Sequence, residues 1–414
     1  MMMITKEYEK VDKITEISEA VRLHYLNEDK FNTNLISIVW TIPAKRETAT
    51  LTALIAEALR LGENGDRALL EEKLSEMYGA VFDSFVIQKG GRQLLTLNIE
   101  CVSDSAAEEK VFKNAVSLIR RTIESKITEK ALTQAKSRLK NTLLEKNDSS
   151  AQYAVERLID ITYPDDAFSV HCGGYASDID DISVRELNEM FVQLKKSAHT
   201  DIFINGEVDY DIAVEAAKSF IGRRNNVEKL PIDEIKEIGG TAEKAEKRNI
   251  GQSRIAMAYT SELKPWGKEW CIGLVLREIL CGSGSSVLYD SVRQEEGLCY
   301  YIGGRLMRFR MLYVIDAGVS AGNEKKTVEL IEKGIKNLCV NEDKLNYAKK
   351  AVERDFKAAE DRRSGVVNEK LNEMLLGVTI NHDIHKDLEG ITVKDIIEAA
   401  NGLKKKGVFI IEAE

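Results

Sequence analysis

The chain has 414 residues, of which 43% are hydrophobic and 31% are charged, and its formal net charge is -9. This composition is typical of a globular protein, and a length above about 250–300 residues predicts more than one domain. An acidic chain without a face rich in lysine and arginine is not expected to bind nucleic acid. No window approaches the roughly 18 consecutive apolar residues of a membrane-spanning helix, so no contact with a membrane is expected.

The cysteines and the N-terminus indicate the compartment. The charged segment 1–19 contains no apolar stretch of signal-peptide length. Wide spacing and mostly apolar neighbours are typical of reduced core cysteines, not of a disulfide framework or a zinc cage. These features predict a cytoplasmic location. The cysteines in question are Cys101, Cys172, Cys271, Cys281, Cys299 and Cys339.

The chain contains an internal duplication. A strand pattern at 34–43 precedes an apolar helical run at 49–61, and the same order recurs with a strand pattern at 252–259 and a helical run at 270–281. Each helical run is followed directly by a glycine, which is a common residue at a helix C-terminus. The repeated order predicts two copies of one unit.

A shorter helix follows in each half, at 70–78 before Gly79 and at 287–296 before Gly297. The two glycines are 218 positions apart (297 − 79). Strands and then long helices come next in both halves. We therefore predict an α+β fold of two homologous units, each an antiparallel sheet with helices packed mainly on one face.

The predicted domain boundaries follow from the composition. The first unit is expected at 1–220 and the second at 248–414. Between them, segment 221–247 loses apolar periodicity and is rich in charged residues. Such a segment is typical of a solvated linker.

A motif in the second half carries a family resemblance. Segment 281–300 reads CGSGSSVLYDSVRQEEGLCY. It resembles a signature of the pitrilysin/insulinase family of zinc peptidases: a loop rich in glycine and serine, a helix, then Arg-x-x-x-Gly-Leu-x-Tyr. Arg293, Gly297, Leu298 and Tyr300 match its fixed positions. The two-unit organisation also matches, so the resemblance covers essentially the whole chain and is nearest to the two-unit bacterial relatives of mitochondrial processing peptidase.

The zinc motif of that family is missing. The family is associated with His-x-x-Glu-His on the first helix of the catalytic half, where two histidines bind zinc and the glutamate activates a metal-bound water. Here the corresponding stretch, 53–61, reads ALIAEALRL, and Glu57 is the only ionisable group in its middle. Neither this motif nor its inverse occurs in the chain. The sequence therefore predicts no metal and no cofactor in this chain.

The remaining histidines provide no clear zinc set. His24 lies in a strand pattern and is predicted to be an ordinary strand residue. His171 has no further ligand at zinc spacing. His382 and His385 are three apart, which would let both face one side of a helix, but their polar neighbours favour a turn.

The glycine-rich loop has two possible interpretations. Gly282 and Gly284 lie in a Gly-Ser-Gly-Ser-Ser stretch that superficially resembles a phosphate-binding loop. The lysine and hydroxyl residue that complete such a loop are missing. We therefore predict a structural turn between two helices, with Gly297 ending the second one.

Two interpretations of Arg293 and Tyr300 compete. From the residues alone, Arg293 complements the dipole of a helix C-terminus and Tyr300 packs in a core. The resemblance implies instead that Arg293 donates hydrogen bonds to peptide carbonyls and that Tyr300 stabilises the oxyanion. Strand alternation predicts opposite faces for Tyr300 and Tyr301, and the motif selects Tyr300. The corresponding positions of the first unit, Ser75 and Phe82, do not reproduce the pair.

These observations favour a subunit that acts in trans. The expected function is that of a non-catalytic subunit in a heterodimeric zinc metallopeptidase, with Arg293 and Tyr300 binding the peptide substrate. The expected partner is a homologous catalytic subunit that carries His-x-x-Glu-His and its zinc. The alternative is a peptide-binding or scaffolding pseudoenzyme without a proteolytic role.

Overall fold

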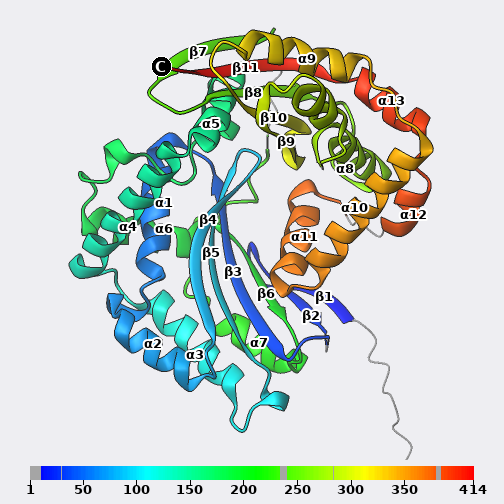
Figure 1. The fold of residues 1–414 in the computed structure, drawn as a ribbon. Coiled ribbons are helices and arrows are strands. Elements are labelled where there is room, and N and C mark those ends of the chain that lie inside the picture. Colours follow the sequence, from blue (N-terminus) through cyan, green and yellow to red (C-terminus); the bar gives the residue numbers. More distant parts are fainter. Residues whose placement is uncertain (1–10, 29, 234–239, 283, 379–383) are drawn as a thin grey trace, which may run out of the picture. The chain divides into compact units, whose positions relative to one another are not determined.

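The computed structural model describes residues 11–28, 30–233, 240–282, 284–378 and 384–414, and the chain forms two compact units (Figure 1). The first unit comprises Met1–Leu144 and Val170–Asp233, and the second comprises Glu145–Ser169 and Glu234–Glu414. In the part of the chain that the structure describes, no helix is long and apolar enough to cross a membrane.

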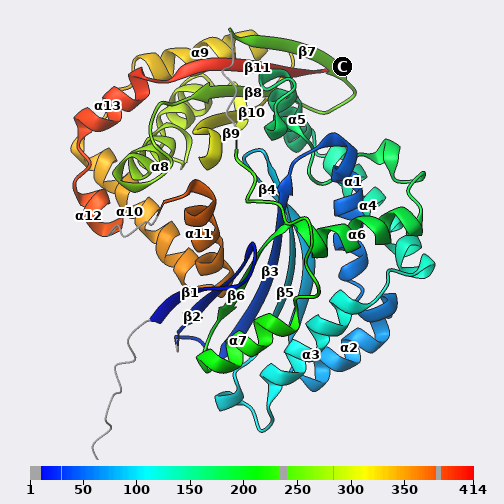
Figure 2. The same cartoon turned by 180° about the vertical axis from the view of Figure 1, so that it is seen from behind.

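The first unit is built on a six-stranded sheet with the order β1-β2-β6-β3-β5-β4 (Figure 2). Neighbouring strands are antiparallel except β2 and β6, which are parallel. The strands are β1 (Val11–Ser18), β2 (Val21–Asn27), β3 (Thr33–Pro43), β4 (Val81–Lys89), β5 (Arg92–Val102) and β6 (His199–Asn205).

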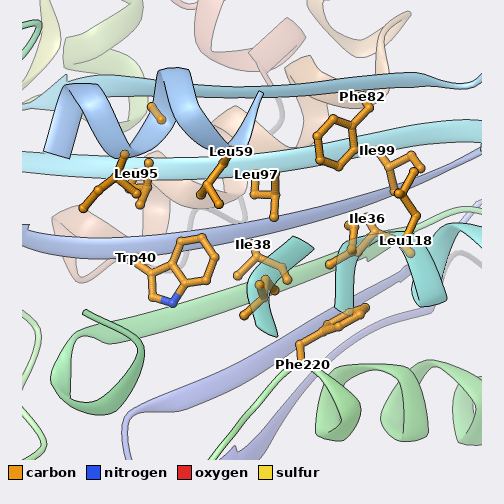
Figure 3. Close-up of a cluster of buried hydrophobic side chains, with 14 of the residues drawn as sticks. Ile36, Ile38, Trp40, Leu59, Phe82, Leu95, Leu97, Ile99, Leu118 and Phe220 are labelled. Carbon is orange, nitrogen blue, oxygen red and sulfur yellow. The ribbon is translucent and has the colours of Figure 1, made fainter. Parts of the chain in front are cut away.

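Helices cover one face of this sheet and enclose its core. Because side chains alternate along a strand, Ile38 and Trp40 of β3 point to the same face, where they are buried with Leu97 of β5 (Figure 3). The ring of Trp40 meets that of Phe191 edge to face, with centroids 6.2 Å apart. The helices are α1 (Arg46–Leu59), α2 (Arg67–Glu76), α3 (Val111–Glu124), α4 (Glu129–Asp148), α6 (Val184–Ser197) and α7 (Tyr210–Ser219).

The second unit has a five-stranded sheet with the order β7-β11-β8-β10-β9. Here β7 and β11 are the parallel pair, and the other neighbours are antiparallel. The strands are β7 (Ala242–Arg248), β8 (Ser253–Thr260), β9 (Cys299–Met307), β10 (Leu312–Val319) and β11 (Lys404–Ala413).

Both faces of the second sheet are packed against helices. The main core contains residues of α8, α9, α10, α12 and α13. The opposite face of the sheet packs against α5 (Ser150–Thr162), whose Leu158 is fully buried (Figure 1). The other α-helices of this unit are α8 (Gly267–Cys281), α9 (Glu324–Lys336), α10 (Glu342–Glu360), α11 (Arg363–Leu376), α12 (Ile384–Glu389) and α13 (Val393–Asn401).

The predicted α+β fold of two homologous units is confirmed. The order β2-β6-β3-β5-β4 of the first sheet corresponds strand by strand to β7-β11-β8-β10-β9 of the second, including the parallel pair. In both units a long helix follows the central strand: α1 follows β3, and α8 follows β8. Each sheet is thus mainly antiparallel with one parallel pair.

The structural units divide the chain differently from the sequence-based boundaries. The expected first unit, 1–220, includes segment 145–169, which the structure groups with the second unit. The reason is the apolar face of α5, which packs on β8, β10 and β11. The expected linker, 221–247, includes most of β7, which pairs with β11 through backbone hydrogen bonds.

Candidate functional site

The helix expected to carry a metal motif is α1 of the first unit, and an ion pair lies at its one central carboxylate. Glu57 accepts a hydrogen bond from Nε of Arg138 on α4 at 3.0 Å and a longer one from Nη1 of Arg60 at 3.5 Å. Arg60 also donates to Asp83 of β4 at 2.5 Å. Guanidinium groups thus neutralise the carboxylate of Glu57. Among the described residues, no group of three histidine, cysteine or acidic side chains is arranged to hold a metal ion.

A polar segment, 171–178, covers the N-terminal part of α1. Arg46 donates to both carboxylate oxygens of Asp178, and Thr50 donates to the same group at 2.8 Å. The hydrogen bond from Arg46 holds the pKa of Asp178 well below its usual range. His171 stacks on the ring of Tyr175 with centroids 5.0 Å apart. His171 is therefore a packing partner in this segment.

A buried charged cluster on β2 and β6 was missed by the sequence analysis. Nε2 of His24 lies 2.7 Å from Oδ1 of Asp201, and Nε of Arg22 donates to the same oxygen at 3.1 Å. His199 approaches the other carboxylate oxygen at 3.1 Å. Burial raises the pKa of Asp201, but hydrogen bonds from His199 and His24 outweigh it and leave the pKa lowered. His24 is a strand residue as predicted, and its partner became visible only through the parallel pairing of β2 with β6.

The last histidine pair falls partly outside the described residues. His382 belongs to segment 379–383, which the structure does not describe. His385 lies in the short helix α12 and not in the predicted turn. Its ring nitrogens lie 3.4 Å from Glu353 and 3.2 Å from Glu389, so acidic neighbours on two helices hold it.

In the second unit, Arg293 lies on a π-helical segment, Tyr289–Glu295. Such segments are rare and are frequent at functional sites. The side chain of Arg293 is exposed, and its guanidinium carbon lies 5.0 Å from the ring centre of Tyr289. The corresponding helix of the first unit, α2, is an ordinary α-helix. The sequence analysis predicted a helix here but not its π-helical form.

Gly282, Gly284 and Gly297 shape the chain on either side of this segment. Gly282 follows α8, and a Cβ atom there would come 1.9 Å from the carboxylate of Glu278. Gly284 lies in the turn that leads to the π-helical segment. Gly297 has a φ of 64°, in the left-handed region that favours glycine. It reverses the chain between Arg293 and β9.

Tyr300 lies at a β-bulge in β9. Tyr301 pairs with Gly318 and Cys299 pairs with Val319, so Tyr300 is an extra residue between the two pairs. Bulges interrupt the alternation of side chains and often re-aim one of them. The bulge removes the regular alternation on which the expected opposite faces of Tyr300 and Tyr301 rested, so that expectation stays a prediction. Both rings are largely exposed, at 61% and 48%.

The chain is similar in sequence to known proteins over part or nearly all of its length. The profile of the Peptidase M16 inactive domain matches residues 181–352. The "Probable inactive metalloprotease YmfF" of Bacillus subtilis (strain 168) is 21% identical over 417 residues, which cover 97% of this chain and 98% of the relative. Both findings support a non-catalytic M16 member, in agreement with the pitrilysin/insulinase resemblance.

Solved structures share the fold of this chain over nearly its whole length. A conserved protein from Enterococcus faecalis V583 has a TM-score of 0.88 at 19% identity, covering 97% of this chain and 99% of its own. A protease from Helicobacter pylori has a TM-score of 0.79 at 15% identity, covering 98% and 100%. The two-unit fold is therefore shared by proteins that differ widely in sequence.

Proposed function

We propose that this chain is the non-catalytic subunit of a two-chain zinc metallopeptidase. A homologous partner with His-x-x-Glu-His supplies the zinc and the attacking water. This chain contributes Arg293, which donates hydrogen bonds to carbonyl groups of the peptide, and Tyr300, which donates its hydroxyl to the oxyanion that forms at the scissile carbonyl. Both groups act only on a reaction that the partner's metal drives. We propose that the two-chain enzyme acts in the cytoplasm.

The observation that carries the proposal is the backbone around the motif. A π-helical segment, a left-handed glycine and a β-bulge follow one another from Tyr289 to Tyr300. The π-helical segment and the bulge are backbone irregularities typical of functional positions, whereas the left-handed glycine has an equivalent in Gly79 of the first unit. They end with Arg293 and Tyr300 exposed, although a tyrosine that served only the core would be buried. The first unit has an ordinary helix at the equivalent place.

The test is a reconstitution. This chain and its zinc-motif homologue are purified separately and together, and cleavage of a quenched fluorescent peptide is measured for each sample. We expect no cleavage by this chain alone, little by the partner alone, and full cleavage by the stable pair. Full activity of the partner without this chain would overturn the proposal and favour a peptide-binding or scaffolding pseudoenzyme.

A further inference from the structure

A second group of charged side chains lies beside the bulge on β9. Along β10, Leu312 and Val314 point to the face of the sheet that packs against α5, so Asp316 points to that same face. Arg305 of β9 pairs with Val314 across the strands, and Arg254 of β8 pairs with Gly318. The three charged residues therefore share one face of the second sheet. We refer to Arg254, Arg305 and Asp316 as the β9 charge cluster.

The carboxylate of this cluster is buried, whereas one of its cations is exposed. The side chain of Asp316 is 6% exposed and that of Arg305 is 48% exposed. Nη2 of Arg305 lies 3.6 Å from Oδ1 of Asp316, which is longer than a hydrogen bond. Burial raises the pKa of Asp316, and the positive charges of Arg305 and Arg254 oppose this rise. Arg305 thus lies near the carboxylate of Asp316 without forming a bidentate hydrogen-bonded ion pair with it.

Glycines bring the cluster close to the backbone of β9 and β10. A Cβ atom on Gly318 would come 2.3 Å from Nη1 of Arg254, so that guanidinium lies directly over the strand. A Cβ atom on Gly303 would come 2.2 Å from the hydroxyl of Tyr301. Arg254 is also fixed by its Nε, which donates to Ser150 at 3.0 Å. The side chains around the cluster therefore pack directly on the backbone of Gly303 and Gly318, where a Cβ atom would collide with them.

The charges of the cluster favour an anion. Two guanidinium groups face one carboxylate, which leaves an excess of positive charge on this face. A cationic group would reach the buried carboxylate of Asp316 only past Arg305, whereas an anionic group meets the exposed guanidinium of Arg305 first. Guanidinium groups bind carboxylates through two parallel hydrogen bonds. The register places Tyr301 on the face of the cluster, because Tyr301 pairs with Gly318, and Tyr300 precedes Tyr301 in the chain.

We propose that the β9 charge cluster is a subsite that binds an acidic side chain of the peptide, through Arg305 and with Asp316 and Arg254 orienting that guanidinium. This inference rests on the proposed function, since it assumes a peptide held at Tyr300. It adds a substrate preference: peptides with aspartate or glutamate near the position held by Tyr300 bind more tightly. The net negative charge of the whole chain does not predict this preference. The preference follows from the local positive charge of the β9 charge cluster.

The test uses the full chain and a random synthetic library of decapeptides. Peptides retained by the immobilised protein are sequenced by mass spectrometry, and their content of aspartate and glutamate is compared with that of the input. We expect acidic residues to be enriched about tenfold at one position, as a charge-assisted hydrogen bond would produce. Arg305→Glu should reverse the preference and enrich lysine and arginine.

A matched control separates the subsite from net charge. Arg185→Glu changes the total charge by the same amount at a side chain that is 84% exposed on α6 of the first unit. This variant should keep both the acidic enrichment and the unfolding midpoint of the parent. Arg305→Glu places a second negative charge beside the buried Asp316, so a lower unfolding midpoint is expected for it. Peptides retained without acidic enrichment, or a reversal by Arg185→Glu as well, would overturn the subsite and leave the proposed function standing. No retained peptides at all would overturn the subsite, whereas the proposed function is decided by the reconstituted pair.

Discussion

Nε of Arg138 donates a hydrogen bond to Oε2 of Glu57 at 3.0 Å, and this contact joins α4 to α1 in the first unit. Glu57 lies in the stretch that corresponds to the zinc helix of the family resemblance. The guanidinium supplies the positive charge next to this carboxylate. The chain therefore has an internal ion pair on the helix where catalytic relatives are associated with a metal ion.

The first prediction concerns zinc content. After incubation with zinc and dialysis, the purified chain should retain no stoichiometric zinc, measured by inductively coupled plasma mass spectrometry. Arg138→Ala should retain none either, since removing the cation leaves Glu57 as one carboxylate where catalytic zinc uses about three protein ligands. The zinc-motif homologue, treated in the same way, is the positive control. One zinc ion per chain in the parent protein would contradict this account.

The second prediction concerns the core of the first unit. Leu97 is fully buried on β5 (Figure 3), so Leu97→Ala should lower the free energy of unfolding by about 2–5 kcal/mol. Leu144, on α4, is 58% exposed, and Leu144→Ala should change this free energy by less than about 0.5 kcal/mol. Urea denaturation followed by circular dichroism measures both. Equal effects of the two substitutions would show that Leu97 is not in a packed core.

The third prediction uses two equivalent glycines. Gly79 and Gly297 have φ angles of 76° and 64°, and a Cβ atom at either position would meet no atom within 4 Å. Replacement of either by alanine should therefore cost a similar amount, about 1–2 kcal/mol, from the left-handed backbone alone. Only Gly297→Ala should also lower peptide cleavage by the reconstituted pair, because Gly297 lies between Arg293 and Tyr300. Equal loss of cleavage with Gly79→Ala would argue against a special role of the second turn.

The fourth prediction concerns pH. The pKa of Asp178 is lowered, chiefly by the hydrogen bond from Arg46, so the ionised form is favoured in the folded state. Its stabilising contribution is present above the unfolded pKa of about 3.9 and is lost as the pH falls. The difference in unfolding free energy between the parent and Asp178→Asn should therefore shrink as the pH is lowered from about 6 towards 3. A difference that stays constant over this range would contradict the assignment.

The repeated architecture could be predicted from the sequence because its signals are local. The strand pattern at 34–43 corresponds to β3 at Thr33–Pro43, and the helical run at 270–281 lies within α8 at Gly267–Cys281. Apolar periodicity and a following glycine suffice for such elements. Two occurrences of the same order then indicate the duplication.

Long-range relationships could not be predicted in this way. The cluster around Asp201 depends on the parallel pairing of β2 with β6, whose strands are separated by most of the first unit in sequence. The sequence shows that α5 has an apolar face, but not that this face packs on β8, β10 and β11 of the second sheet. The bulge at Tyr300 is a register shift between two strands, which no single strand pattern reveals.

The central claim is that Arg293 and Tyr300 act in the partner's active site, and cleavage kinetics of the reconstituted pair test it most directly. We predict that Tyr300→Phe lowers kcat by about 100-fold or more, as removal of one oxyanion donor does, and that Arg293→Lys mainly raises KM. Tyr347→Phe, at an exposed tyrosine on α10, should cleave at the parent rate. Parent kinetics for both Tyr300→Phe and Arg293→Lys, in a pair of normal stability, would contradict the account.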